Sequence, residues 1–362
     1  MGGSLTRRDF VALGGSLGAA LLAGCAGAQG NDTDSAADAT QTVETETSET
    51  GGIDYLALVN KTHALPEDWE QVVEITSFKN SEDWDVDVEA KAYDAYLALK
   101  DDLEADDVFV DLDSAYRSVE AQQKIVDEFT EKYGEEYVKK YVAVPGYSEH
   151  HTGLALDLFL IIDGKGVYYN EDMVKYPEVW EKIHAKLADH GFILRYLPGK
   201  KIETGYSYEP WHIRYLDDPA IAHEIMDEGI TFERYLGELD PMIADCVVDY
   251  GTSELYEEAD MDAALDAVLA EFSTWKGCVL KRFSYAGDDV SADNLDYANS
   301  LRDEGTEAFD QAIVFGSDFH SPSAEDAEGT AWEADTDYEG WSWTLGRTGA
   351  DGAWQLLTWG YA

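Results

Sequence analysis

Residues 148 to 157 read Ser-Glu-His-His-Thr-Gly-Leu-Ala-Leu-Asp, a stretch rich in side chains that can hold a metal. A second stretch, Glu-Pro-Trp-His at 209 to 212, adds another histidine and a carboxylate. Together they supply two or three histidines, an aspartate and a spare glutamate. Zinc enzymes commonly bind the metal through three such groups and keep the fourth position for water, and an unligated carboxylate can take a proton from that water. The two stretches therefore indicate a mononuclear catalytic zinc site.

Asp157 lies in an unusual sequence context for a carboxylate. It is seven residues after His150, too far for two ligands on one helical turn. Residues 154 to 162 form an apolar run of strand length that ends at Asp163-Gly164, a turn signal. A carboxylate inside an apolar strand is costly unless it is paired or bound to a metal. We expect Asp157 to be a metal ligand, and the alternative is a structural aspartate in a salt bridge or loop cap.

His212 lies in a second strand-like run, Glu-Pro-Trp-His-Ile-Arg-Tyr at 209 to 215. Proline is tolerated in a strand only at an edge or an irregular position. Pro210 therefore suggests that the site lies at the border of the sheet.

The ordered motifs Ser-x-His-x-x-Gly-x-Ala-x-Asp and Glu-x-Trp-His resemble those of the VanY-type D-alanyl-D-alanine carboxypeptidases. This family is part of a group of zinc peptidases that includes the lysostaphin-type enzymes and the hedgehog fold. Other segments are similar to the family as well: Pro-Gly-Tyr-Ser-Glu-His at 145 to 150, Gly-Phe-Ile-Leu-Arg-Tyr at 191 to 196, Thr-Gly-Tyr at 204 to 206, and Ser-Ala-Tyr-Arg-Ser at 114 to 118 followed by Gln122. The resemblance covers roughly residues 53 to 237.

The resemblance implies a zinc-dependent, not a serine-type, carboxypeptidase that removes the terminal D-alanine from peptidoglycan stem peptides. At the matching positions, His150, Asp157 and His212 would bind one Zn²⁺ per catalytic domain. Glu209 would act as the general base and then as the acid that protonates the leaving amine.

The substrate side of the implied site consists of three residues. Arg117 would hold the scissile carbonyl and its developing negative charge, a role that needs a fixed cation. Gln122 and Ser148 would line the substrate pocket. His151 stands where the family usually has a glutamine, and it could compete as a metal ligand.

Two alternatives remain open at this stage. The family contains carboxypeptidases that cut a D,D bond and relatives that cut an L,D bond, and the motifs do not separate them. A different class is a non-catalytic, zinc-containing cell-wall-binding protein of the hedgehog type. Because Glu209, Arg117 and all three ligands are present, we favour the enzyme.

Residues 1 to 25 are expected to be a twin-arginine lipoprotein signal. Thr-Arg-Arg-Asp-Phe at 6 to 10 is a twin-arginine pattern, and a run of apolar and small residues leads to Leu-Ala-Gly-Cys at 22 to 25. In such a signal Cys25 becomes the lipidated N-terminus. The alternative is an uncleaved membrane anchor, and both interpretations place the protein at the outer face of the cytoplasmic membrane, in the cell envelope.

Residues 26 to 52 are predicted to be an acidic disordered linker. Positions 31 to 50 contain only Asp, Glu, Ser, Thr, Ala, Gln, Asn and one Val, without a basic residue. Such a segment cannot bury enough apolar surface to fold, and its like charges keep it extended. It would tether the catalytic domain and give it reach toward the cell wall.

The predicted catalytic domain, residues 53 to 240, has the α+β pattern of helices and short strands in blocks. Helical spacing of apolar residues predicts helices over 86–103, 119–129 and 180–187. Alternation at 108–112 predicts a strand that delivers Ser114 to Arg117 to the site.

Residues 245 to 362 are predicted to form a second, smaller α+β domain of unknown function, with one helix on an antiparallel sheet. The helix is expected over 254–272 and the strands over 279–285, 312–315, 341–347 and 354–361. Six tryptophans lie from Trp275 onward, and we favour a core role over surface binding of sugars or peptides. Cys246 and Cys278 leave a disulfide open. The domain is expected to be dispensable for catalysis on a soluble peptide.

The composition excludes one class of partner. The chain has 25 Lys+Arg and 75 Asp+Glu, a formal net charge of −50. Such a surface repels phosphate, so nucleic acid is not expected as a partner. The expected partners are peptidoglycan stem peptides, with membrane contact only through the lipid on Cys25.

Overall fold

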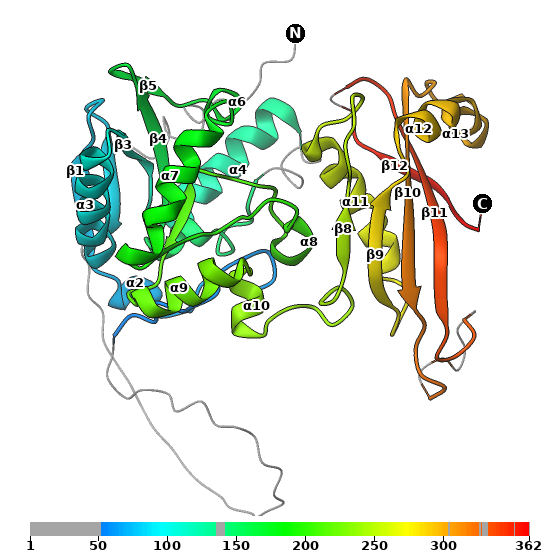
Figure 1. Cartoon of the computed structure of the whole chain (residues 1–362), viewed down its shortest axis with the longest axis horizontal. Coiled ribbons are helices and arrows are strands. Elements are labelled where there is room, and N and C mark those ends of the chain that lie inside the picture. The colour runs from blue at the N-terminus through cyan, green and yellow to red at the C-terminus, as the bar shows by residue number, and fades with distance from the viewer. Residues whose placement is uncertain are drawn as a thin grey trace, which may run out of the picture.

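The computed structural model describes residues 52–134, 142–302, 305–325, 327, 332–350 and 352–361. Two lobes lie side by side, the first holding the elements up to α10 and the second those from β8 onward (Figure 1). Each lobe has its own buried apolar core. The predicted signal with Cys25 and almost all of the predicted linker lie outside the described residues. Within the described ranges, no helix has the length and apolar character needed to cross a membrane.

The first lobe is built on a five-stranded antiparallel sheet with the order β3-β4-β7-β6, and β5 pairs with β4. Its strands are β3 Val110–Ser114, β4 Ala155–Ile162, β5 Lys165–Val167, β6 Phe192–Leu194 and β7 His212–Tyr215. Residues 155 to 160 of β4 are all buried, as the apolar run in the sequence predicts.

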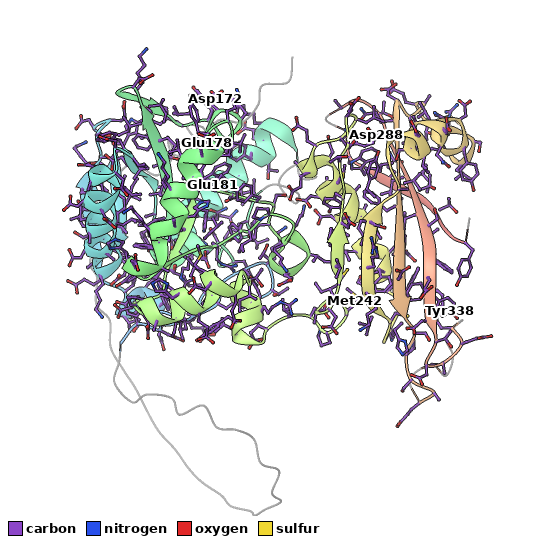
Figure 2. All side chains as sticks on the ribbon, in the orientation of Figure 1. Asp172, Glu178, Glu181, Met242, Asp288 and Tyr338 are labelled. Atoms are coloured by element: carbon purple, nitrogen blue, oxygen red, sulfur yellow. The ribbon has the colours of Figure 1, made fainter. Side chains whose placement is uncertain are left out.

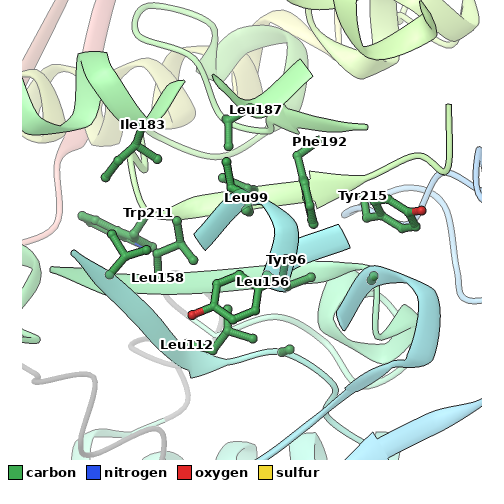
Figure 3. Packing of buried hydrophobic residues seen from close by; sticks show 14 of the residues in the cluster. Tyr96, Leu99, Leu112, Leu156, Leu158, Ile183, Leu187, Phe192, Trp211 and Tyr215 are labelled. Atoms are coloured by element: carbon green, nitrogen blue, oxygen red, sulfur yellow. The ribbon is translucent and has the colours of Figure 1, made fainter. Parts of the chain in front are cut away.

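The first lobe also contains several helices. They are α2 Trp69–Val72, α3 Ala90–Ala105, α4 Val119–Tyr133, α6 Asn170–Met173, α7 Pro177–Leu187, α8 Lys201–Thr204, α9 Pro219–Glu228 and α10 Phe232–Leu236, with short 3-10 turns at Glu149–Thr152 and Ala188–His190. Figure 3 shows Leu99 of α3 and Ile183 and Leu187 of α7 in one cluster with apolar side chains of the sheet. Residues of α9 and α10 pack with Ile193 of β6 in a separate cluster.

Local sequence explains where the helices near the site begin. Ser118 accepts a hydrogen bond from the Ala121 amide and thereby caps α4, the helix that carries Gln122. Pro177 occupies the first turn of α7, where its missing N–H leaves no hydrogen bond unmade. The helices predicted over 119–129 and 180–187 are therefore confirmed, with α4 four residues longer at its C-terminal end and α7 three residues longer at its N-terminal end.

The helix predicted over 86–103 is wrong at its start. Residues Asp85–Glu89 form strand β2, which pairs with β1, Ile75–Lys79, in a separate two-stranded antiparallel sheet. Val86 and Val88 are buried and alternate with less buried neighbours, as expected for a strand. The Glu89 carboxylate then caps α3 by accepting from the Ala92 amide.

The second lobe is a five-stranded sheet with the order β12-β11-β10-β9-β8 and one long helix on its face. Its elements are β8 Val247–Asp249, α11 Glu258–Phe272, β9 Val279–Tyr285, α12 Asp288–Asp293, α13 Leu295–Leu301, β10 Gln311–His320, β11 Asp337–Arg347 and β12 Gln355–Gly360. The predicted helix on a sheet is present, although α11 begins at Glu258, four residues later than predicted. Two features were missed: β8 runs parallel to β9, so the sheet is mixed, and α12 and α13 add two short helices.

The tryptophans of the second lobe belong mostly to its core. Trp343 is fully buried, Trp275 and Trp354 are less than a tenth exposed, and Trp359 is 41% exposed. Trp343 also packs against Phe272 of α11. This confirms the core interpretation for most of the set.

The two cysteines of the second lobe are free and buried. Burial raises the pKa of the Cys246 thiol, with a further contribution from Glu203, to about 12, and burial raises that of Cys278 to about 11. Because both thiols are free in the structure, the disulfide that the sequence left open is absent.

Acidic side chains cover much of the outer surface. Glu178 and Glu181, for example, are exposed on α7 (Figure 2). Acidic groups that face water keep a protein soluble and repel polyanions, in line with the composition.

Candidate active site

Three side chains that the sequence singles out meet at the ends of two central strands. Asp157 of β4 pairs directly with His212 of β7, and His150 approaches from the short turn before β4. His150 Nε2 lies 3.4 Å from one carboxylate oxygen of Asp157, and His212 Nδ1 lies 3.1 Å from the other. One donor atom from each residue lies within 4.8 Å of the other two, and all three residues are buried.

Hydrogen bonds on the far side of each imidazole fix the ring orientation. His150 Nδ1 donates to the Ala115 carbonyl oxygen at 2.7 Å, which leaves Nε2 to face the site. His212 Nε2 donates to the Glu149 carboxylate at 3.1 Å, which leaves Nδ1 to face the site. Metal-bound histidines characteristically donate their second N–H to a carbonyl or carboxylate in this way. Two such imidazoles and one carboxylate suit a zinc ion and leave a position for water.

Glu209 lies beside this triad without being part of it. Its Oε2 is 3.7 Å from His212 Nδ1, and its side chain is about a third exposed. The Glu209 amide donates to the Tyr196 carbonyl, and the Glu209 carbonyl accepts from the His212 amide, so a short turn fixes the carboxylate near the ring. The expectation of a site at the sheet border is wrong, because Pro210 precedes β7 and β7 lies between β4 and β6.

Arg117, Gln122 and Ser148 line one pocket with the triad and Glu209. The pocket has a volume of about 170 Å³. Arg117 Nη1 donates to the Gln122 side-chain oxygen at 3.0 Å, and Gln122 Nε2 donates to the Ala143 carbonyl at 2.8 Å. The guanidinium is thus held in place by a buried amide that is itself anchored to the backbone.

His151 uses both ring nitrogens elsewhere. Its Nδ1 donates to the Arg117 carbonyl at 2.6 Å, and its Nε2 accepts from the Gly146 amide at 3.1 Å. It is therefore outside the triad, and it supports the backbone of Arg117.

The part of the chain that holds this pocket is similar to known proteins. A model of the family described as VanY, D-alanyl-D-alanine carboxypeptidase, matches residues 85–218. The chain is 34% identical over 190 residues to a D-alanyl-D-alanine carboxypeptidase of Enterococcus faecalis, covering 50% of this chain and 65% of that relative. It is 32% identical over 185 residues to the bifunctional D-Ala-D-Ala dipeptidase and D-Ala-D-Ala carboxypeptidase VanXYC of Enterococcus gallinarum, covering 50% of this chain and 92% of the relative.

The chain belongs to the VanY family. Among solved structures, it is similar to a mutant of the vancomycin-resistance D,D-pentapeptidase VanY in complex with Zn(II), at 32% identity and a TM-score of 0.42, covering 50% of this chain and 98% of that one. The segment matched by the VanY model contains every predicted site residue from Arg117 to His212 and none of the second lobe.

A buried charge network behind the site of this VanY-family chain was not anticipated. Glu149 Oε1 accepts from Arg195 Nε at 2.8 Å and from Arg214 Nη1 at 2.9 Å. Arg195 also forms a two-bond pair with Glu233, whose carboxylate accepts from the Asn60 side chain. All five side chains are less than a tenth exposed. These residues are scattered along the sequence, and the only available signal was that each arginine precedes a tyrosine in an apolar segment.

The network sets the charge states next to the triad. Burial opposes ionisation of Glu149, but Arg195 and Arg214 outweigh it and hold the carboxyl pKa well below its usual range. Burial alone would also lower the pKa of His212, whereas hydrogen bonds from its ring to Asp157 and Glu149 raise that pKa to about 9. For His150 burial dominates and lowers the pKa. Without a metal, the Glu149 carboxylate is therefore ionised, and the His150 imidazole loses its proton more readily than an exposed histidine.

Several further residues to which the sequence analysis gave no individual role line the same pocket, among them Ser114, which was expected near the site. They are Asp113, Ser114, Ala143, Asn170, Tyr196, Tyr206 and Trp211. The Tyr196 ring lies 4.7 Å from that of His212 and 4.7 Å from that of Tyr206. Two aromatic rings thus form a wall next to the candidate metal-binding side chains.

Proposed function

We propose that this protein is a zinc-dependent carboxypeptidase that removes the terminal D-alanine from peptidoglycan stem peptides. The observation that carries the proposal is the convergence of His150, Asp157 and His212, with Glu209 next to them in one pocket. Membership of the VanY family supports the substrate class.

In the proposed site, Nε2 of His150, the carboxylate of Asp157 and Nδ1 of His212 would hold the zinc ion. Bound zinc would lower the pKa of a water molecule and polarise the scissile carbonyl. The two imidazoles are pre-oriented by the Ala115 carbonyl and the Glu149 carboxylate, so little reorganisation is needed to form the site.

Glu209 moves the protons. Its carboxylate takes a proton as the water oxygen bonds to the carbonyl carbon, and it returns that proton to the nitrogen as the C–N bond breaks. D-Alanine then leaves as a free amine. The position of Glu209, beside His212 but outside the triad and partly open to the pocket, fits a group that must exchange protons instead of holding a metal.

Arg117 stabilises negative charge that develops on the substrate. A fixed cation is most effective when it needs no reorganisation during the reaction. The bond from Arg117 to Gln122, and the bond from Gln122 to the backbone, provide this fixation. Gln122 and Ser148 complete the lining on this side of the pocket.

We also propose that the protein is exported and anchored by a lipid on Cys25, at the outer face of the cytoplasmic membrane. The support is the sequence alone: the twin-arginine pattern at 6 to 10 and the Leu-Ala-Gly-Cys ending at 25. Metabolic labelling with a fatty acid tests this proposal. Label should appear on the wild type and be absent from Cys25→Ala, and equal labelling of both would contradict the anchor.

The experiment that tests the activity compares two muropeptides, a pentapeptide that ends in D-Ala-D-Ala and a tetrapeptide that ends in one D-alanine. D-Alanine release is measured with zinc and again after chelation. Release from the pentapeptide alone, lost on chelation, is expected. Release from the tetrapeptide alone would assign an L,D-carboxypeptidase, and release from neither would favour a non-catalytic wall-binding protein.

A further inference from the structure

We propose that the second lobe holds one wall of the active-site pocket in position, and that Asp262 of α11 is the positioning residue. This inference rests on the function proposed above. The wall is the segment from 199 to 209, which contains α8, Tyr206 and Glu209. Figure 1 shows α8 at the side of the first lobe that faces α11.

The segment is packed into the second lobe. Ile202 of α8 is 6% exposed and belongs to the apolar cluster of that lobe, together with Met261 and Leu265 of α11. Two polar contacts lie near this apolar contact. The Gly199 amide donates to the Glu258 carboxylate at 3.1 Å, and Lys201 pairs with Asp266 at 2.9 Å. Each of these contacts joins the segment to α11.

Asp262 makes the contact nearest to the catalytic groups. Ser207 Oγ donates to one of its oxygens at 2.6 Å, and the Tyr250 hydroxyl donates to the other at 3.0 Å. Asp262 is 1% exposed. A buried carboxylate whose two oxygens are both bonded gives a fixed anchor, because loss of either bond leaves a buried polar oxygen unsatisfied.

Ser207 connects Asp262 to the residues that line the pocket. It directly follows Tyr206, which lines the pocket, and it lies two residues before Glu209. The Tyr206 ring packs on Tyr196, which packs on His212. A shift of Ser207 would therefore move both the aromatic wall and the proposed general base.

The first lobe supports the same segment from another side. Gly205 adopts a positive φ of 77°, and a Cβ there would lie 3.1 Å from Cδ of Lys61. The Lys61 ammonium lies 4.9 Å from the centre of the Tyr206 ring. The segment is thus held between Lys61 and α11, so its position depends on contacts from both lobes.

These contacts argue against the expectation that residues 245 to 362 are dispensable for catalysis. Removal of the second lobe would expose Ile202 and break the bonds at Gly199, Lys201 and Ser207 together. The second lobe is, on this account, part of the structure that shapes the substrate pocket, although it lies outside the segment matched by the VanY family model.

The test uses hydrogen exchange of the amides of residues 199–209 in the full chain, without added metal, together with kcat/KM for the pentapeptide with zinc. In Asp262→Ala, we expect faster exchange over this segment and a kcat/KM lower by about 10- to 100-fold, the size of effect that a misplacement of about 1 Å can have. Asp262→Asn should behave like the wild type, because its amide can donate to Ser207 Oγ while its oxygen accepts from Tyr250.

Two further variants separate positioning from general stability. Ser207→Ala removes the same bond from the first lobe and should give the same local rise in exchange. Phe309→Ala weakens a separate apolar cluster of the second lobe, which Phe309 forms with Ala298 and Ala312, so it should lower the melting temperature and leave native exchange at 199–209 unchanged.

Unchanged exchange at 199–209 in both Asp262→Ala and Ser207→Ala would overturn the inference. Asp262→Asn exchanging as fast as Asp262→Ala would overturn it too. If the wild type releases no D-alanine while the two alanine variants still loosen the segment, the positioning contact stands and the proposed substrate is wrong.

Discussion

Glu149 accepts a hydrogen bond from His212 Nε2 at 3.1 Å, on the side of the imidazole ring opposite the nitrogen that faces Asp157. The same carboxylate is bonded to Arg195 and Arg214 through its other oxygen. Because Glu149 is only 3% exposed and both arginines are fully buried, these groups compensate one another with little help from water. One carboxylate thus orients a candidate metal ligand and, together with Glu233, balances the charges of Arg195 and Arg214.

Glu149→Ala should weaken both the fold and metal binding. Removing one partner of a buried ion pair costs about 3–5 kcal/mol, because the opposite charge is left uncompensated. Loss of an outer-shell partner of a metal-bound histidine typically lowers metal affinity by about 10- to 100-fold. Denaturant unfolding of the metal-free protein and a competitive zinc titration measure the two effects.

A matched control for Glu149 is Asp111→Asn, at a buried carboxylate that contacts Tyr96 and Lys100 away from the pocket. This change should lower the free energy of unfolding and leave zinc affinity unchanged. Equal zinc affinity in Glu149→Ala and the wild type would show that Glu149 does not orient His212.

His151→Gln should retain one zinc per chain and activity close to that of the wild type. A glutamine can donate to the Arg117 carbonyl and accept from the Gly146 amide, the two bonds that His151 makes. His151→Ala loses both bonds and should reduce stability by about 1–3 kcal/mol. Zinc content by mass spectrometry and thermal unfolding provide the measurements, and loss of zinc from His151→Gln would make His151 a ligand after all.

Cys246 and Cys278 should react slowly with alkylating reagents in the native protein at neutral pH. Burial raises their pKa to about 12 and about 11, so very little thiolate is present. Because their pKa values are raised in the folded protein, the two thiols contribute fully to its stability at a pH below the unfolded thiol pKa of about 8.5. That stability is lost as the pH rises toward the folded values. Peptide mapping after alkylation of the native and of the denatured protein at pH 7 measures the reaction of each cysteine. A peptide pair joined by a disulfide between the two cysteines would contradict the presence of free thiols.

The elements that bring the candidate ligands together could be predicted from the sequence. The apolar run around Asp157 gives a buried strand, and the short motif that ends at His212 starts another. The two strands are neighbours in one sheet, and their register Asp157–His212 places two donors side by side. These local signals are strong because each apolar run in the sequence corresponds to a strand that is buried in the sheet.

What could not be predicted depends on contacts between distant segments. Arg195 and Arg214 look like ordinary surface charges until β6 and β7 pair and place both beside Glu149. Asp262 looks like one of many acidic residues of a helix until α11 meets Ser207. Strand β2 was missed because its alternation spans only Asp85–Glu89 and runs directly into the helical pattern of α3.

The most direct test of the zinc carboxypeptidase assignment is D-alanine release from the pentapeptide by the wild type and Glu209→Gln, with bound zinc measured in the same samples. We expect one zinc per chain in both proteins and a kcat about 10²- to 10⁴-fold lower in the variant, the usual contribution of a general acid–base. Full turnover by Glu209→Gln, or a wild type that releases D-alanine without zinc, would contradict the account.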